Sequence, residues 1–385
     1  MTTHDDSAPV LFEERGAAGG RRIGIATLNA PRTLNGFSLQ MAHLLDAQLQ
    51  RWAEDDGIAL VLLQGAGEKA FCAGGDLHSL YRSMLEYREA GQQDIRANAY
   101  AGEFFEVEYR LDHRIHTFPR PVLCWGHGIV MGGGIGLMSG ASHRVVSERS
   151  KLAFPEISVG LFPDVGGSWL LNRVPDGAGR FLALTGAMLS PADAIHAGLA
   201  DVQLPEVSRA DVLEALVQTA WSDSAKERSA QLDAVLASYA VTPEPGPLQR
   251  HAAAIAAACE GEVLEDIVAA ISAMPSADEP WLATAQATMA AGAPGSLRLG
   301  FELQRRAVGM SLAEVFRMEY IVALHCAAHG DFAEGIRALL IDKDRTPRWN
   351  PAALAQADAD WAAGFLHEPD WPGGTHPLAD LGGAS

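Results

Sequence analysis

The stretch "RRIGIATLNAPRTLNGFSLQMAHLLDAQLQRWAEDDGIALVLLQG", residues 21–65, decides the fold class. Residues 21–29 form a short β-type run, residues 38–55 carry apolar side chains at helical spacing, and residues 58–65 are a continuous apolar run of strand length. A strand, a helix and a buried strand in this order predict a βαβ unit with parallel strands and a right-handed crossover. We therefore expect an α/β fold with parallel sheets and flanking helices.

The same alternation continues along the chain. Residues 121–129 are predicted to form another buried strand, residues 132–142 a helix that begins in glycines, and residues 143–154 further strands. After residue 205 the composition changes to Ala- and Leu-rich segments that are typical of helices. We find no internal repeat.

These patterns predict three parts: an α/β core that holds the ligand site over 1–205, a helical region that completes the fold over 206–352, and a partly flexible C-terminal tail over 353–385. The clearest break within the helical region is "TPEPGP", whose three prolines cannot lie inside a helix. Ser311 and Glu314 have capping-box spacing and predict that a helix begins there.

Composition excludes several classes of protein. The 385 residues include 48 acids and 29 Lys or Arg, a net charge of −19, and no basic cluster suited to DNA or RNA. The four cysteines are far apart with no paired Cys or His spacing, so neither a metal site nor a disulfide framework is indicated. No apolar run approaches the ~20 residues of a membrane span, and the acidic N-terminus lacks the features of a targeting peptide. We expect a cytoplasmic protein that binds neither nucleic acid nor membrane.

Two glycine clusters could approach a ligand closely. They are "FCAGGDL" at 71–77 and "MGGGIGL" at 131–137, and the second begins a predicted helix. Glycine allows backbone conformations that aim free N–H groups at an anionic atom, and two such groups would form an oxyanion hole. The alternative is that both clusters are ordinary tight turns. Neither matches the patterns of dinucleotide or P-loop sites.

Two acids, Glu156 and Asp164, lie eight positions apart in the otherwise apolar, Gly- and Pro-rich stretch "LAFPEISVGLFPDVGGSWLL". Paired carboxyl groups in such surroundings are candidates for general acid–base or nucleophilic chemistry. Structural roles remain open at this point: Glu156 in a turn, and Asp164 as the N-cap of a following helix.

These motifs together resemble a known family. "LNAPRTLNGFS", "KAFCAGGDL", "MGGGIGL" and "FPEISVGLFPDVGGSWLL" look like the enoyl-CoA hydratase/isomerase (crotonase) superfamily, and within it the 3-hydroxyisobutyryl-CoA hydrolase subfamily. The resemblance continues through "FRMEY" and covers roughly residues 20–352. It implies a crotonase-like spiral of ββα units with a C-terminal helical region, an acyl-CoA substrate, no cofactor beyond the CoA of that substrate, no metal, and subunits that can associate as a homo-oligomer.

The resemblance also implies site residues. In the superfamily the thioester carbonyl lies between two backbone N–H groups, which correspond here to Gly75 and Gly133. Neighbouring positions are implied to contact the substrate or its CoA: Arg32, Ala73, Gly74, Asp76 and Gly132.

The carboxyl groups distinguish the reactions within this family. Hydratases use two glutamates, and here the first of those positions is Gly136, whereas the second is Glu156. The hydrolase subfamily resembles this chain in carrying an acid at the position of Asp164. The leading expectation is hydrolysis of 3-hydroxyisobutyryl-CoA, as in valine breakdown, with Glu156 as nucleophile or general base and Asp164 as its partner. The alternatives are a hydratase or isomerase that uses Glu156 alone, and an acyl-CoA-binding protein without turnover.

Overall fold

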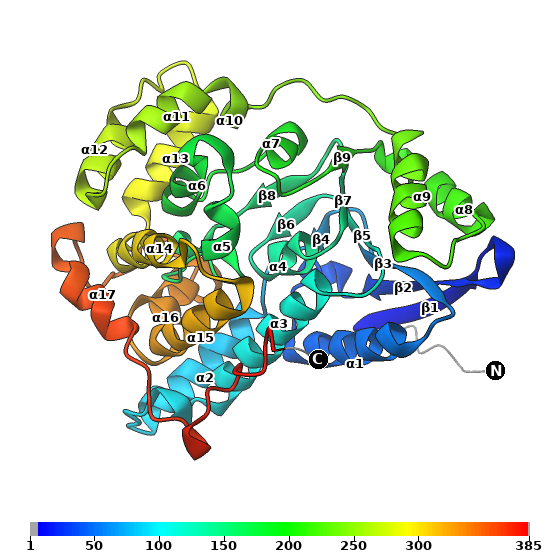
Figure 1. Ribbon diagram of the computed structural model, residues 1–385. Helices are drawn as coiled ribbons and strands as arrows, with labels where there is room; N and C mark the ends of the chain where they lie inside the picture. The colour runs from blue at the N-terminus through cyan, green and yellow to red at the C-terminus, as the bar shows by residue number, and fades with distance from the viewer. Residues whose placement is uncertain (1–6, 384–385) are drawn as a thin grey trace. The chain divides into compact units, whose positions relative to one another are not determined.

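The computed structural model describes residues 7–383 and divides the chain into two compact units (Figure 1). Unit 1 comprises Met1–Gly75, Leu111–Leu152 and Leu189–Gly246, and unit 2 comprises Asp76–Arg110, Ala153–Met188 and Pro247–Ser385. Each part expected from the sequence is one continuous segment, whereas each of these units is made of three separate segments. The last segment of unit 1 ends inside the proline-rich break at 242–247.

Unit 1 is built on a six-stranded sheet. Its strands are β1 (Val10–Gly16), β2 (Arg22–Leu28), β3 (Ile58–Gly65), β5 (Val122–Gly126), β7 (His143–Val146) and β9 (Val202–Gln203), adjacent in that order. The strand β1 is antiparallel to β2, and every other neighbouring pair is parallel. The expected α/β class with a largely parallel sheet is therefore confirmed.

The first βαβ unit forms as the sequence predicts. The helix α1 (Leu39–Glu54) connects β2 to β3, and the Ser38 side chain caps it by accepting the N–H of Met41. Trp52 of α1 packs on Gly24 of β2, where an added Cβ would come within 2.8 Å of the indole ring. Only a residue without a side chain fits beneath this tryptophan.

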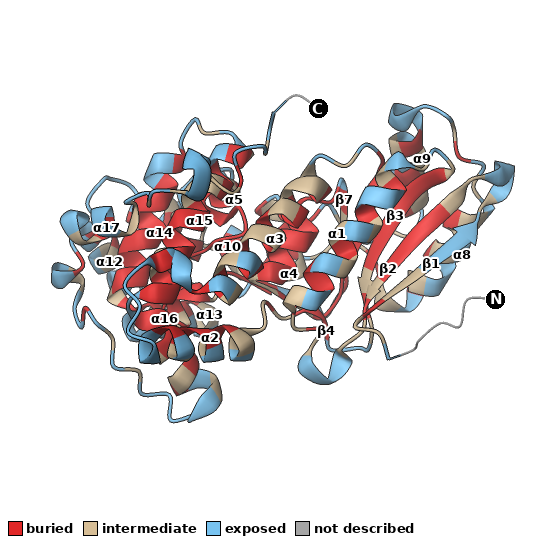
Figure 2. Ribbon diagram, turned by 90° about the horizontal axis from the view of Figure 1, so that it is seen from below, coloured by how far each residue is buried: buried red, intermediate tan, exposed pale blue. Residues whose placement is uncertain are grey.

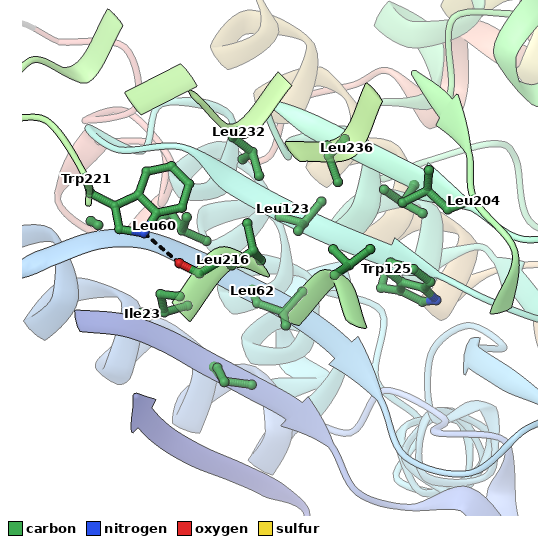
Figure 3. Packing of buried hydrophobic residues seen from close by; sticks show 14 residues of the cluster. Ile23, Leu60, Leu62, Leu123, Trp125, Leu204, Leu216, Trp221, Leu232 and Leu236 are labelled. Atoms are coloured by element: carbon green, nitrogen blue, oxygen red, sulfur yellow. Dashed lines mark hydrogen bonds between the residues drawn. The ribbon is translucent and has the colours of Figure 1, made fainter. Parts of the chain in front are cut away.

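One hydrophobic core of unit 1 lies on the sheet face that carries Ile23, opposite Gly24, and is covered by α8 (Arg209–Gln218) and α9 (Ala225–Ala237) (Figure 3). Leucines from both helices pack against leucines of the sheet and against two tryptophans, Trp125 and Trp221. Burial of this apolar surface is the main stabilising term for the sheet. The remaining helices wholly within unit 1 are α4 (Gly133–Ser139) and α7 (Pro191–His196).

A second, three-stranded sheet carries the glycine clusters. Its strands are β4 (Ala70–Cys72), β6 (Ile129–Met131) and β8 (Lys151–Ala153), adjacent in that order. The single strand expected over 121–129 is split: β5 ends at Gly126, and β6 begins at Ile129 in the other sheet. Gly128 makes this turn with φ of +57° and lies against the Lys69 carbonyl, where an added Cβ would come within 2.2 Å.

Unit 2 is helical. Its helices are α2 (Leu77–Glu89), α5 (Gly167–Leu171), α6 (Ala178–Thr185), α10 (Pro247–Arg250), α11 (Ala252–Ala258), α12 (Leu264–Ala273), α13 (Pro280–Ala291), α14 (Pro294–Ala307), α15 (Leu312–Ala328), α16 (Asp331–Ile336) and α17 (Ala359–Phe365). It also takes most of α3 (Ala99–His116). The helices α14 and α15 are largely buried (Figure 2), and the predicted capping box of Ser311 and Glu314 begins α15.

The C-terminal segment has defined contacts where composition predicted a partly flexible tail. Arg317 of α15 donates to the carbonyl groups of Leu378 and Leu381, and Arg110 forms an ion pair with Asp380. These contacts join the segment to α3 and α15 within unit 2. None of the helices between residues 7 and 383 combines the length and apolarity needed to cross a bilayer.

Candidate active site

In unit 1, both glycine clusters follow strands of the small sheet. The strands β4 and β6 pair in parallel, so the glycines that follow them leave the same edge of the sheet. The two segments are in close contact, because a Cβ on Gly134 would lie 2.3 Å from the carbonyl oxygen of Cys72. Gly74 has φ of +107° and Gly132 has φ of +48°, conformations that L-residues rarely adopt. The glycines are thus required by backbone geometry.

The N–H groups of Gly75 and Gly133 are free donors. The Gly74 carbonyl accepts the N–H of Phe37 at 2.8 Å. A trans peptide directs its C=O and N–H in opposite directions, so the Gly75 N–H points away from Phe37. Among residues 7–383, no acceptor lies in hydrogen-bonding geometry with the N–H of Gly75 or Gly133. By contrast, the Ala73 N–H is already donated to the Leu34 carbonyl at 3.1 Å.

Arg32 lies beside a cavity of about 350 Å³ within unit 1. The cavity is also lined by Glu68, by Lys69 and by the loop at 30–35, so two cationic side chains and one acid border it. Buried Asn35 holds that loop by donating to the carbonyl groups of Ala66 and Ala70 at 3.0 and 2.9 Å. Arg32 itself is exposed.

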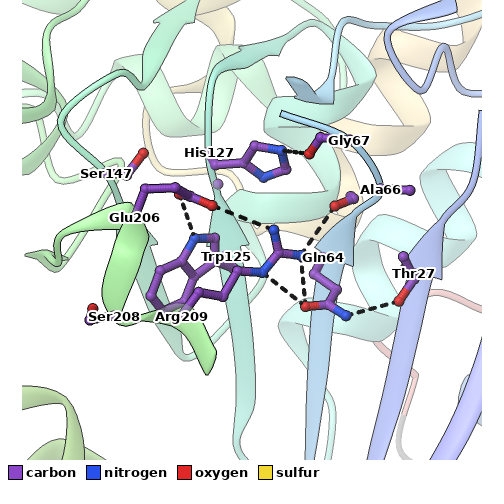
Figure 4. Close-up of polar contacts among 12 residues, drawn as sticks. Thr27, Gln64, Ala66, Gly67, Trp125, His127, Ser147, Glu206, Ser208 and Arg209 are labelled. Carbon is purple, nitrogen blue, oxygen red and sulfur yellow. Dashed lines mark hydrogen bonds and ion pairs between the residues drawn. The ribbon is translucent and has the colours of Figure 1, made fainter. Parts of the chain in front are cut away.

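The turn at 65–69, which forms part of this cavity, is also held from inside unit 1 (Figure 4). Arg209 donates to Gln64 and to the Gly65 carbonyl, and the His127 ring contacts the Gly67 carbonyl at 2.9 Å. These contacts assign His127 a structural role at this turn.

Asp76 acts as a helix cap in unit 2. Its carboxylate accepts the Ser79 N–H at 3.1 Å and the Ser79 hydroxyl at 2.7 Å, at the first turn of α2. The residue that was a candidate for substrate contact therefore uses its side chain to begin a helix.

Glu156 is buried in unit 2, with 4 % of its surface exposed, in a short 3₁₀ turn that follows Pro155. Its carbonyl accepts the N–H groups of Val159 and Leu161, which fixes the backbone of this turn. Its Oε2 atom has no hydrogen-bond partner among the described residues. Because buried polar atoms are nearly always paired, an orphaned carboxyl oxygen indicates a place for a substrate or water.

Asp164 is also buried, and it does not cap a helix as the alternative allowed. The helix α5 has Gly166 at its N-cap, whereas the Asp164 carboxylate accepts the Tyr109 hydroxyl at 2.8 Å. The Tyr109 ring stacks on Phe316, with ring centroids 5.4 Å apart. Asp164 is thus oriented by an aromatic pair from α3 and α15.

A third carboxyl group, Glu319, belongs to the same cluster. It is fully buried in α15 and accepts the N–H groups of Gly166 and Ser168 at 2.8 and 2.9 Å. Neither Glu319 nor Tyr109 was predicted from the sequence as a site residue. The signal for Glu319 was an acid within the apolar run of "FRMEYIVALH", inside a motif already quoted for the family resemblance.

Burial raises the pKa of all three carboxyl groups, and like charge adds to this effect at Glu156 and Glu319. Desolvation raises the pKa of Glu156 well above its usual range, and the Asp164 charge raises it further. Burial raises the pKa of Asp164 to about 6, although the hydrogen bond from Tyr109 opposes this shift. Burial raises the pKa of Glu319 to about 8, against the lowering effect of the Ser168 N–H. Such shifts are typical of catalytic carboxyl groups.

The shifted pKa of Asp164 predicts a pH-dependent stability difference. An acid whose pKa is raised by folding stabilises the native state fully below its unfolded pKa, and this contribution is lost as the pH rises through the folded value. For Asp164 that window runs from 3.8 to about 6. As the pH rises through this window, we expect the free energy of unfolding of Asp164→Asn to increase relative to that of the native chain, as measured by urea denaturation. A relative loss of stability across the same window would contradict the assigned shift.

The fold, the free N–H groups of the glycine clusters and the buried carboxyl groups are together typical of one class of enzyme. The family model described as enoyl-CoA hydratase/isomerase matches residues 23–366, and the chain belongs to this family. In particular, it is similar to the mitochondrial 3-hydroxyisobutyryl-CoA hydrolases of Danio rerio (38 % identity, 92 % of this chain, 88 % of the relative) and Homo sapiens (34 % identity, 92 % and 88 %).

Two solved structures share the whole fold. A carnitinyl-CoA dehydratase from Mycobacterium thermoresistibile has a TM-score of 0.83 and 34 % identity, covering 98 % of this chain and 100 % of that one. An enoyl-CoA hydratase from Rhodobacter sphaeroides has a TM-score of 0.80 and 33 % identity, covering 93 % and 97 %. These similarities confirm the crotonase-like fold with its C-terminal helices.

One expectation is wrong. The cytoplasmic location expected from the N-terminal sequence is contradicted by the similar hydrolases, which are named as mitochondrial proteins. That expectation rested only on the composition of the first residues, which is a poor guide to the compartment of a protein.

Proposed function

We propose that this chain hydrolyses the thioester of 3-hydroxyisobutyryl-CoA to 3-hydroxyisobutyrate and CoA, a step of valine breakdown. The observation that carries the proposal is the buried, unpartnered Oε2 of Glu156, in a cluster with a second buried acid, Asp164. The similarity to curated hydrolases of this name over about nine-tenths of the chain supports the same substrate.

The N–H groups of Gly75 and Gly133 serve as the oxyanion hole. Attack on a thioester places negative charge on the carbonyl oxygen, and two free backbone donors stabilise that charge without reorganising. Their lack of any acceptor among the described residues supports this role. The adjacent Ala73, Gly74 and Gly132 shape the backbone around these donors.

Glu156 supplies the reacting carboxylate, and two routes begin at its free oxygen. As a nucleophile it attacks the thioester carbon and expels CoA thiolate, and water then opens the resulting anhydride. As a general base it takes a proton from water, whose oxygen adds to the same carbon before the thiolate leaves. Both routes give one free acid and one free thiol. Asp164 either binds the 3-hydroxyl group of the substrate or holds the attacking water.

CoA binding is assigned to the two cationic residues of the unit 1 cavity, which Glu68 also lines. Arg32 and Lys69 border that cavity, and both can pair with phosphate groups. Beyond the CoA of the substrate, no cofactor enters this reaction.

Hydration is the second candidate function, because the two solved structures with high similarity are titled as a dehydratase and a hydratase. Addition of water across a double bond needs a base for water and an acid for carbon. The position where hydratases carry their first glutamate is Gly136 here, which has no side chain. The hydrolase is therefore favoured.

Loss of the Tyr109 hydroxyl is expected to move the pH profile. Because that hydrogen bond lowers the pKa of Asp164, Tyr109→Phe should raise this pKa and shift the acid limb of kcat/KM to higher pH. At pH values on the acid limb, kcat/KM should fall about 10- to 100-fold, which corresponds to the free energy of a hydrogen bond to a charged group. Tyr320→Phe is the control, since its hydroxyl donates to the Gly102 carbonyl at 3.3 Å rather than to Asp164. Equal profiles for both variants would contradict the role of Tyr109.

The direct test of the function is product analysis. Purified protein should convert 3-hydroxyisobutyryl-CoA into equal amounts of free thiol, measured with a thiol reagent, and free acid, measured by mass spectrometry. Absence of thiol release from this substrate and from other short 3-hydroxyacyl-CoA thioesters would overturn the proposal.

A further inference from the structure

Glu319 is a buried acid that forms no ion pair within residues 7–383. It lies in the middle of α15 and is fully inaccessible to solvent. Both carboxylate oxygens accept backbone N–H groups: Oε2 accepts that of Gly166, and Oε1 accepts that of Ser168. A buried carboxylate is costly unless it is hydrogen-bonded, so its presence here calls for a local reason.

The segment that Glu319 holds has an unfavourable backbone. Val165 has φ of +54° and Gly166 has φ of +79°. A β-branched residue in the left-handed region is a genuine outlier, and such a turn persists only where its surroundings enforce it. The carboxylate of Glu319 binds the N–H that directly follows Val165, and thereby stabilises the turn. This turn begins at Asp164, whose carbonyl accepts the Gly167 N–H at 2.7 Å.

We propose that Glu319 is a positioning residue for Asp164, which it acts on through the left-handed turn at Val165 and Gly166. The inference rests on the proposed function, because it assigns Glu319 a part in the same reaction. Glu319 does not touch the reacting atoms in this account.

The same helix orients the Asp164 side chain. Phe316 lies one turn before Glu319 on α15 and stacks on Tyr109, whose hydroxyl donates to Asp164 at 2.8 Å. One face of α15 therefore fixes Asp164 twice: Glu319 fixes its backbone, and Phe316 fixes the phenol that binds its carboxylate.

The charge of Glu319 also acts on the cluster. The titratable groups that influence one another here are Glu156 from the 3₁₀ turn, Asp164 from its loop, Tyr109 and Glu108 from α3, and Cys326 from α15. An ionised Glu319 raises the pKa of Glu156 through like-charge repulsion. Because burial raises the pKa of Glu319 to about 8, this repulsion acts only above about that pH, where Glu319 is ionised.

The test compares Glu319→Gln and Glu319→Asp with Glu314→Gln, which removes an exposed capping acid from the same helix. In Glu319→Gln the amide oxygen can accept one N–H, while the amide NH₂ opposes the other. We expect kcat to fall on the order of 10²-fold with little change in KM, because a misplaced catalytic group has that effect. Glu314→Gln should lower thermal stability at most, with the native kcat and pH profile.

Glu319→Asp separates position from charge and keeps the proposal testable if the Gln variant does not fold. Its carboxylate is shorter by one methylene and is displaced from the two N–H groups, so kcat should fall with little change in KM. Native kcat in either Glu319 variant, or an equal loss in Glu314→Gln, would overturn the positioning role.

Failure of the proposed function is distinguishable from failure of this inference. Absence of CoA release in the native protein refutes the function alone. The position of Asp164 is then followed by ¹³C NMR of labelled aspartate, with Asp164→Asn identifying the signal. The Asp164 signal should change its chemical shift in Glu319→Gln and keep it in Glu314→Gln, and an unchanged signal in both would refute the inference.

Discussion

Glu156→Gln is expected to abolish nearly all thioester hydrolysis while leaving the protein folded. The substitution keeps the size of the side chain and removes its ability to attack carbon or accept a proton. Loss of a positioned base or nucleophile lowers the rate about 10²- to 10⁴-fold. Since Oε2 has no partner among residues 7–383, its replacement breaks no hydrogen bond there. Thiol release and the thermal unfolding midpoint measure the two effects.

Glu302→Gln is the matched control for that experiment. Glu302 is also buried, on α14, but it pairs with Arg305 rather than with the acid cluster. We expect native kcat in this control. If both glutamine variants lost activity equally, burial of an amide and not the chemistry of Glu156 would explain the loss.

The second large effect is expected at Gly133. Gly133→Pro removes the N–H that we assign to the oxyanion hole, and proline is tolerated in the first turn of a helix such as α4. Loss of one such donor lowers the rate about 10²- to 10³-fold.

Gly133→Ala provides the comparison, because it adds bulk at the same Cα and keeps the N–H. The proline variant should therefore be about 10²- to 10³-fold slower than the alanine variant in kcat for thiol release. Equal rates in the two variants would show that the Gly133 N–H plays no part in the reaction.

The parts of the fold that the sequence predicts are those with strong local signals. The strands β2 and β3 and the helix α1 follow hydrophobic periodicity, and α15 begins at the capping box that its spacing indicates. The split between β5 and β6 was not predictable, because the turn at Gly128 is imposed by the Lys69 carbonyl of a distant segment.

The candidate site shows the same limit. Glu156 and Asp164 could be found because acids stand out in an apolar stretch, and the free N–H groups follow from the glycine motifs. Tyr109 lies 55 positions from Asp164, and Glu319 lies 153 positions from Gly166. An acid or a tyrosine in a helix is common in any sequence, and only the folded chain shows that these two meet the loop of Asp164.

Whether this chain is a hydrolase or a hydratase is tested most directly by giving the native enzyme two substrates in parallel. Release of free CoA from 3-hydroxyisobutyryl-CoA is measured beside hydration of crotonyl-CoA, both as kcat/KM. We expect efficient CoA release that Glu156→Gln abolishes. We also expect hydration to be slower by orders of magnitude, because Gly136 supplies no acid. Efficient hydration of crotonyl-CoA without CoA release would contradict both expectations and would make this chain a hydratase.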